Sequence, residues 1–189
     1  MRIIGGTARG LHLTPVGAGD AAAHLRPTSD RVREAIFNLL INGGYGNPVA
    51  DARVLDAFAG TGALGLEALS RGAAHATFLD TGAPALALVR RNVTLMRAET
   101  RATALKRDAT RPGPCPGLGT PHTLIFLDPP YGKTLGQAAL TALAATGWLA
   151  PEALVVLEEG TPPTPPAGFD QLDQRRYGDT TVTLLRAAK

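Results

Sequence analysis

The sequence predicts a doubly wound α/β fold, in which a mostly parallel sheet is covered by helices. Three observations lead to this prediction. Short apolar runs alternate with stretches of helical spacing between residues 53 and 157, a glycine-rich loop follows the first run, and an acidic residue stands at the end of four runs in succession. Buried strands that alternate with helices at this spacing form parallel sheets with both faces covered.

Residues 1–27 show short extended stretches interrupted by glycine, which predicts a hairpin or an extended arm. The pattern changes at Thr28. Ser29 or Asp30 can cap a helix, and apolar residues then recur at helical spacing until Asn42-Gly43-Gly44. We therefore divide the chain into an N-terminal hairpin extension, 1–27, and a larger domain, 28–189.

The next region predicts strands at 53–58, 75–80, 102–107, 123–127 and 153–157, and helices at 63–71, 84–97 and 135–145. The tail departs from this alternation. Its two apolar stretches, 172–177 and 181–185, are joined only by Gly178-Asp179-Thr180. A link this short permits only antiparallel pairing, so the sheet is expected to end in a hairpin and to contain seven strands.

Composition narrows the functional classes. The 189 residues are 44% hydrophobic and carry 19 Lys+Arg against 16 Asp+Glu, a mildly basic balance. One cysteine, Cys115, excludes an internal disulfide, and the four histidines lack metal-ligand spacing, so no metal site is expected. No signal peptide or membrane span is predicted. We expect a cytoplasmic monomer.

The segment Gly60-Thr61-Gly62-Ala63-Leu64-Gly65 follows a predicted strand, opens a predicted helix and matches the G-x-G-x-x-G pattern of nucleotide-binding loops. Asp80, at the end of the next strand, suits ribose hydroxyls, so NAD is one candidate ligand. Asp56 disfavours NAD, because its negative carboxylate would face the negative pyrophosphate of that cofactor. The same carboxylate suits the positively charged ammonium and sulfonium groups of S-adenosylmethionine. The residues predicted to contact this cofactor in the loop are Phe58, Ala59, Gly60, Thr61 and Gly62.

The ends of the other strands extend this predicted cofactor site. In open α/β sheets the ligand lies at the carboxyl ends of the strands, near the point where strand order reverses. Asp56, Asp80, Asp108 and Asp128 all occupy such ends. We predict that Asp108, with Ala109, reaches the adenine.

The tetrapeptide Asp128-Pro129-Pro130-Tyr131 directly follows the fourth of these strands. An exocyclic amine on a flat ring is a poor nucleophile, because its lone pair is delocalised into the ring. Acceptors on both N–H bonds draw the nitrogen toward tetrahedral geometry, and this stabilisation grows in the transition state. We predict that Asp128 and the Pro129 carbonyl are those acceptors, that Tyr131 stacks on the ring, and that the four residues form the catalytic motif.

The tetrapeptide alone does not determine which base is methylated, because an adenine-N6 methyltransferase of DNA or RNA would hold its target amine in the same way. The short chain has no room for a separate DNA-reading domain, which disfavours DNA. A cytosine-C5 methyltransferase would attack with a cysteine, but Cys115 precedes the fourth strand whereas the site follows it. A non-catalytic RNA-binding protein is disfavoured because the cofactor loop and the tetrapeptide are both intact.

Arginines crowd the first segment, where few acidic residues oppose them. Guanidinium groups suit phosphate, whereas the plain alternative is a solvated surface. The candidate phosphate-binding residues are Arg2, Arg9, Arg26, Arg31 and Arg33.

Several long motifs together resemble the RsmD family of 16S ribosomal RNA guanine-N2 methyltransferases: residues 2–6, 9–10, 26–38, 56–73 and 176–180. The resemblance spans the chain. It implies a Rossmann-like class I S-adenosylmethionine-dependent methyltransferase with a small N-terminal β-hairpin extension. It further implies methylation of N2 of one guanine in 16S ribosomal RNA, free or in a small-subunit assembly intermediate, with the arginine-rich segment helping to hold the RNA.

This sequence departs from the family pattern in two places. Asp80 stands where glutamate is more usual, and Thr81-Gly82 follow it where the family commonly has a charged residue. The loop 112–121 is also unusually rich in proline and glycine. Neither departure touches the tetrapeptide at 128–131.

Overall fold

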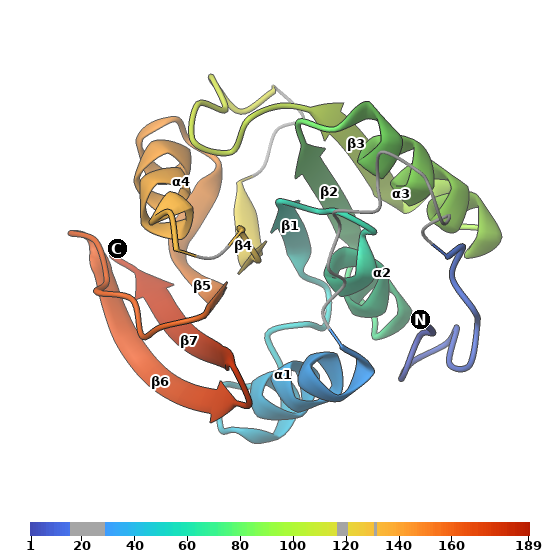
Figure 1. Ribbon diagram of the computed structural model, residues 1–189, viewed down its shortest axis with the longest axis horizontal. Helices are drawn as coiled ribbons and strands as arrows, with labels where there is room; N and C mark the ends of the chain where they lie inside the picture. The colour runs from blue at the N-terminus through green and yellow to red at the C-terminus, as the bar shows by residue number, and fades with distance from the viewer. Residues whose placement is uncertain (16–28, 117–120, 131) are drawn as a thin grey trace.

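The computed structural model describes residues 1–15, 29–116, 121–130 and 132–189. A seven-stranded sheet in the order β3-β2-β1-β4-β5-β7-β6 forms its centre (Figure 1). The strands are β1 (Arg53–Ala57), β2 (His75–Asp80), β3 (Ala102–Lys106), β4 (His122–Leu127), β5 (Leu149–Glu159), β6 (Phe169–Tyr177) and β7 (Thr180–Ala187).

The first five strands pair in parallel, and the last two add antiparallel strands at one edge. Strand order reverses between β1 and β4, where Ala57 pairs with Leu127. Ligands of open α/β sheets bind at the carboxyl ends of the strands near such a reversal. The predicted mostly parallel sheet with a terminal hairpin is confirmed.

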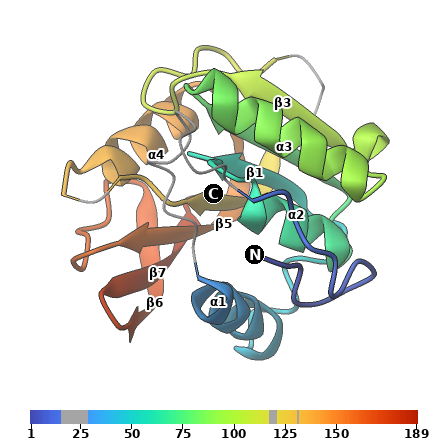
Figure 2. The ribbon, with the colours of Figure 1, turned by 45° about the vertical axis from the view of Figure 1, so that its right-hand side comes forward.

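The described residues contain four α-helices: α1 (Asp30–Asn42), α2 (Ala63–Ser70), α3 (Ala83–Leu95) and α4 (Leu135–Ala145). One face of the sheet packs against α1, α2 and α3, which contribute Phe37, Leu66 and Val89 to a single buried cluster. The opposite face packs against α4, whose Leu140 lies in a second cluster with Leu55. Figure 2 shows α2 and α3 lying along the sheet. Burial on both faces explains the near-continuous apolar strands.

In the described part of the connection between β3 and β4, residues 107–116 form a loop rather than a helix. The loop is pinned next to α4, since the Trp148 indole donates to the Gly113 carbonyl at 2.9 Å and the Cys115 amide donates to the Thr146 carbonyl at 3.1 Å. Within the described residues, α4 and this loop therefore cover this face of the sheet.

The N-terminal residues form a small antiparallel turn, reduced to a single bridge between Arg2 and His12. Hydrogen bonds from Ile3 to Leu11 and from Leu13 to Met1 continue it. Ile3 and Leu13 are buried in the same cluster as α1 and α2, and the segment runs alongside α2 and α3 (Figures 1 and 2). The predicted boundary at 27/28 falls outside the described residues and stays a prediction.

Most element bounds agree with expectation to within two residues. One exception is β6, predicted at 172–177 but beginning at Phe169. The other is β5, predicted at 153–157 but extending from Leu149 to Glu159. It is longer because it lies between β4 and β7 and pairs with both. Its last residues, Glu158 and Glu159, therefore belong to the carboxyl edge of the sheet. Among the described helices, none has the length and apolar character needed to cross a bilayer.

Candidate active site

The glycine loop connects β1 to α2 through left-handed backbone conformations. Phe58 has φ of 70°, Gly60 of 53° and Gly62 of 77°, and the Gly62 amide donates to the Ala59 carbonyl at 2.6 Å. Gly62 immediately precedes α2, so glycine lets the chain turn there without a Cβ penalty. Of the predicted cofactor contacts, Ala59 and Thr61 are buried beneath this turn.

Asp56, the fourth residue of β1, is buried, and its Oδ2 accepts a hydrogen bond from the Gly65 amide at 2.9 Å. The pKa of Asp56 is raised to about 8, chiefly by burial and in smaller part by the carboxylates of Asp128 and Asp80, whose effects outweigh the lowering by the Gly65 hydrogen bond. A cationic ligand would supply the counter-charge that this carboxylate lacks.

Asp80 ends β2 and ties two turns together. Its Oδ2 accepts from the Gly60 amide at 2.9 Å, and its Oδ1 accepts from the Gly82 amide at 2.7 Å. Each carboxylate oxygen has a second lone-pair site, so both oxygens can still accept from a ribose hydroxyl.

Asp108 follows β3 and organises its own loop. Its Oδ1 accepts from the Thr110 amide at 2.9 Å and the Thr110 hydroxyl at 2.7 Å. These hydrogen bonds lower the pKa of Asp108, the Thr110 hydroxyl contributing most. The two bonds fill the acceptor sites of Oδ1, and Nη2 of Arg111 donates to Oδ2 at 3.4 Å. A ligand could still use the second lone pair of Oδ2, next to the buried Ala109.

Asp128, Pro129 and Pro130 directly follow β4, with Asp128 half-buried, Pro129 buried and Pro130 exposed. Asp128 raises the pKa of both Asp56 on β1 and Glu159 on β5. The Asp128 carboxylate is therefore near enough to Asp56 and Glu159 for its charge to act on both. Tyr131, the last residue of the predicted catalytic motif, lies outside the described residues.

Glu159 lies at the same edge of the sheet, and the sequence reasoning did not consider it. It ends β5 with 5% of its surface exposed. Carboxylates thus stand at the ends of four neighbouring strands. In the order of the sheet they are Asp80 on β2, Asp56 on β1, Asp128 after β4 and Glu159 on β5. The sequence did contain a signal, because the pair Glu158-Glu159 follows an apolar run. The strand was predicted to end at residue 157, so these two residues were not counted as part of it.

A second group that sequence reasoning missed centres on Glu67 of α2, which is fully buried. Its carboxylate accepts from the amides of Ile4 and Gly5, both at 2.8 Å, and from Nε of Arg71 at 2.7 Å. The N-terminal segment is thereby fixed to the helix that begins at the glycine loop. A glutamate inside the otherwise apolar run 63–69 was the signal.

Asn92 of α3 makes a further link between the N-terminal segment and the loop. Its Oδ1 accepts from the Thr14 amide at 2.8 Å, and its Nδ2 donates to the Thr61 carbonyl at 3.3 Å. Asn92 is fully buried, so both contacts are shielded from water.

The predicted RNA-binding arginines fall into three groups. Arg2, Arg9 and Arg31 are exposed. Arg26 lies outside the described residues. Arg33 is fully buried: its Nη2 donates to the Arg2 carbonyl and to Asp30, and its Nε lies 3.6 Å from Glu67. Burial does not agree with a role for Arg33 at an RNA surface, and its guanidinium joins α1 to the N-terminal segment instead.

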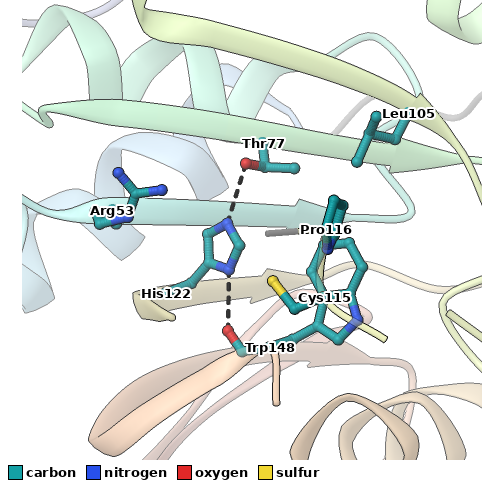
Figure 3. A pocket seen from close by; sticks show the side chains of 7 residues that line it. All are labelled: Arg53, Thr77, Leu105, Cys115, Pro116, His122 and Trp148. Atoms are coloured by element: carbon teal, nitrogen blue, oxygen red, sulfur yellow. Dashed lines mark hydrogen bonds between the residues drawn. The ribbon is translucent and has the colours of Figure 1, made fainter. Parts of the chain in front are cut away.

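A separate small pocket opens on the face of the sheet that carries α4 (Figure 3). Its lining consists of Arg53, Thr77, Leu105, Cys115, Pro116, His122 and Trp148. Arg53 and His122 are the first residues of β1 and β4, so this pocket lies toward the opposite end of the strands from Asp56 and Asp128.

The histidine in this pocket has two partners. Nδ1 of His122 lies 2.9 Å from the Trp148 carbonyl, and Nε2 lies 3.0 Å from the Thr77 hydroxyl. A carbonyl only accepts, so Nδ1 carries the proton and Nε2 accepts from Thr77. Burial lowers the pKa of His122 to about 4. Its contacts are those of a packed core residue. No group of His, Cys, Asp and Glu able to hold a metal ion occurs among the described residues.

The sheet order, the glycine loop and the carboxylates at the reversal point define a class I methyltransferase fold. Within this class, the chain belongs to the family described as Conserved hypothetical protein 95, whose model matches residues 1–186. This membership confirms the resemblance to the RsmD family noted in the sequence.

Individual relatives match along nearly the whole chain. Ribosomal RNA small subunit methyltransferase D of Escherichia coli is 41% identical, with 98% of this chain and 89% of the relative covered. The protein of the same name from Haemophilus influenzae is 32% identical over 98% of this chain and 93% of its own length. Among solved structures, yhhF from Escherichia coli is similar with a TM-score of 0.80 at 33% identity, covering 100% of this chain and 98% of that chain.

Proposed function

We propose that this chain uses S-adenosylmethionine to methylate the exocyclic N2 amine of a guanine in small-subunit ribosomal RNA. One observation carries the proposal. Asp56 and the Asp128-Pro129 motif stand on the adjacent strands β1 and β4, where strand order reverses, and Asp128 raises the pKa of Asp56. A site for a cationic methyl donor therefore adjoins a site for an amine.

The residues at the glycine loop fit the donor. Asp56 offers a buried carboxylate for the ammonium and sulfonium charges, and Asp80 holds the loop through Gly60 while keeping free lone pairs for the ribose. Asp108 and Ala109 are the proposed adenine contacts. When bound, S-adenosylmethionine supplies a methyl group that is electrophilic because it is attached to a sulfonium.

Asp128 is proposed to orient the amine and stabilise its developing positive charge. Its carboxylate would accept one N–H and the Pro129 carbonyl the other, so that the nitrogen lone pair is released from the ring. Once methylated, the amine is strongly acidic, and Asp128 can take the proton without being a strong base. Stacking by Tyr131 remains part of the proposal on sequence grounds.

Ribosomal RNA as the substrate is supported by family membership and by the names of the relatives above. The choice of guanine N2 is supported by the sequence motifs that resemble the RsmD family. Three exposed arginines near the N-terminus offer cations to the RNA backbone: Arg2, Arg9 and Arg31.

The test is nucleoside mass spectrometry of small-subunit ribosomal RNA from cells that lack this protein. We expect one N2-methylguanine to disappear and to return when the wild-type chain is supplied. Unchanged N2-methylguanine would refute the proposal, and loss of an N6-methyladenine in its place would favour the adenine alternative.

A further inference from the structure

The side chain of Glu159 is an ionisable group that the fold leaves unsatisfied. It is 5% exposed, and within the part of the chain that the structure describes its Oε1 has no hydrogen-bond partner. Its backbone is accounted for by pairing with Thr181 of β7. A buried carboxylate oxygen without a partner is costly, and such groups call for an explanation, of which a ligand that supplies the missing donor is one.

The geometry around Gly136 places this carboxylate beside the proposed catalytic motif. Gly136 lies in the first turn of α4, and a Cβ built there would stand 2.5 Å from Cδ1 of Leu157, 3.3 Å from Oε1 of Glu159 and 3.5 Å from Cγ of Pro129. The carboxylate oxygen of Glu159 and the ring of Pro129 therefore both lie close to the start of α4. Glycine is required at position 136 because a side chain there would collide with Leu157.

The electrostatics agrees with this proximity. The pKa of Glu159 is raised from its usual value, first by burial and then by the carboxylate of Asp128. Asp128 directly follows β4 and Glu159 ends β5, and Leu127 and Leu157 of these parallel strands are paired. Two carboxylates therefore lie at the same edge of the sheet, on neighbouring strands.

A pair of carboxylates matches guanine and opposes adenine. Guanine presents two adjacent kinds of donor, its ring N1–H and its exocyclic amine, whereas adenine presents an amine beside the N1 lone pair. A carboxylate only accepts when ionised, so it bonds to the first edge and repels the second. A site discriminates strongly against a wrong base when that base leaves buried polar groups of the protein without hydrogen-bond partners.

We infer that Glu159 is a specificity-determining residue that accepts the N1–H of the target guanine while Asp128 holds its amine. This inference rests on the proposed function and adds a reason for guanine that the Asp128 motif alone does not provide. The donor from the base would be the partner that Oε1 of Glu159 lacks.

The test uses two ribosomal RNAs that differ only at the target position, one with guanine and one with 2,6-diaminopurine. Diaminopurine keeps the 2-amino group but has a lone pair at N1. The variant Glu159→Gln keeps the side-chain shape and adds a donor that can face that lone pair. Glu152→Gln is the matched control, because Glu152 lies on the same strand with a side chain 54% exposed.

We expect the wild type and Glu152→Gln to prefer guanine, and Glu159→Gln to lower the guanine/diaminopurine ratio of kcat/KM roughly 10- to 100-fold, the size expected for one hydrogen bond to a charged group. The ratio of RNA affinities, measured with S-adenosylhomocysteine bound, should fall in the same direction. Cofactor affinity and Tm should not fall.

An equal loss on both RNAs with an unchanged ratio would show that Glu159 acts only in the fold, and the inference would be wrong. The proposed function fails in a different way, by an absence of N2 methylation in the wild type itself. Should Glu159→Gln not fold, Glu159→Ala would be compared through the same ratio, and a ratio equal to that of the wild type would again overturn the inference.

Discussion

The amide of Gly65 donates a hydrogen bond to Oδ2 of Asp56 across 2.9 Å, joining β1 to the first turn of α2. The contact is close on every side, since a Cβ at Gly65 would lie 2.4 Å from the Phe78 ring and 3.2 Å from the same Oδ2. Glycine is thus required here by the approach of helix to strand. The carboxylate of Asp56 is held in place before any ligand arrives.

This arrangement predicts that cofactor affinity rises with pH. Because the folded pKa of Asp56 is about 8, the unliganded protein carries a proton on this group near neutral pH, and a cationic ligand must displace it. Affinity for S-adenosylmethionine should increase up to about tenfold per unit between roughly pH 6 and pH 7.5. Calorimetry in two buffers of different ionisation enthalpy would measure the released proton.

Asp56→Asn is the matched variant, since an amide oxygen can still accept from Gly65. A raised folded pKa means that the stability contribution of Asp56 is present below its unfolded value of 3.8 and is lost as pH rises through about 8. The variant should therefore bind the cofactor weakly and without this pH dependence, yet melt at a higher temperature than the wild type at pH 8. Pronounced pH dependence retained in the variant would contradict the role given to Asp56.

A second prediction concerns Glu67, which receives hydrogen bonds from Ile4, Gly5 and Arg71. Removing one partner of a buried ion pair leaves the other unsatisfied, so Glu67→Ala should lower the free energy of unfolding by about 3 kcal/mol. Hydrogen exchange at the Ile4 and Gly5 amides should speed up more than exchange in the central strands. Chemical denaturation and exchange mass spectrometry would measure both effects.

The matched control for Glu67 is Glu34→Ala, because Glu34 is exposed on α1. Surface substitutions of this kind usually change stability by less than about 0.5 kcal/mol. If Glu67→Ala were equally mild, the buried network would not be what fixes the N-terminal segment.

A third prediction addresses the RNA surface. Arg9 and Arg31 are both exposed, and replacing both with glutamine should weaken RNA binding and make its dependence on salt shallower by roughly one counterion per lost phosphate contact. Arg175→Gln is the control, because Arg175 lies on the edge strand β6 and pairs with Asp173. Identical salt slopes for the wild type and the double variant would mean that both arginines are ordinary surface charges.

A fourth prediction follows from the buried His122. Its folded pKa of about 4 lies below the unfolded value of 6.5, so the unfolded chain binds the proton first as the solution is acidified. Stability is complete above pH 6.5 and is lost as pH falls from 6.5 toward about 4, by on the order of 3 kcal/mol in all. Denaturant titrations across this range would show the slope.

The control for His122 is the exposed His12. His12→Gln should leave the slope unchanged, while His122→Gln should flatten it. A wild-type protein with constant stability between these pH values would show that His122 is not held neutral by its surroundings.

The strands of the sheet could be predicted from the sequence because the buried strands are nearly continuous apolar runs. The terminal hairpin could be predicted because the link 178–180 is too short for a parallel crossover. The positions of Asp56, Asp80 and Asp128 at the carboxyl edge of the sheet could be predicted because each lies at or just after the end of such a run. Glu159 and Arg33 were not understood, since burial depends on long-range partners: Glu159 is placed by β7 and α4, and Arg33 by Glu67, which is 34 positions away.

The most direct test of the central claim is the identity of the methylated nucleoside. Purified protein, S-adenosylmethionine with a labelled methyl group and unmodified small-subunit ribosomal RNA would be incubated, and the digested RNA analysed by mass spectrometry. We expect label in N2-methylguanosine with the wild type, and at least roughly a hundredfold less with Asp128→Asn at unchanged cofactor affinity. Label in N6-methyladenosine, or undiminished transfer by Asp128→Asn, would contradict the account.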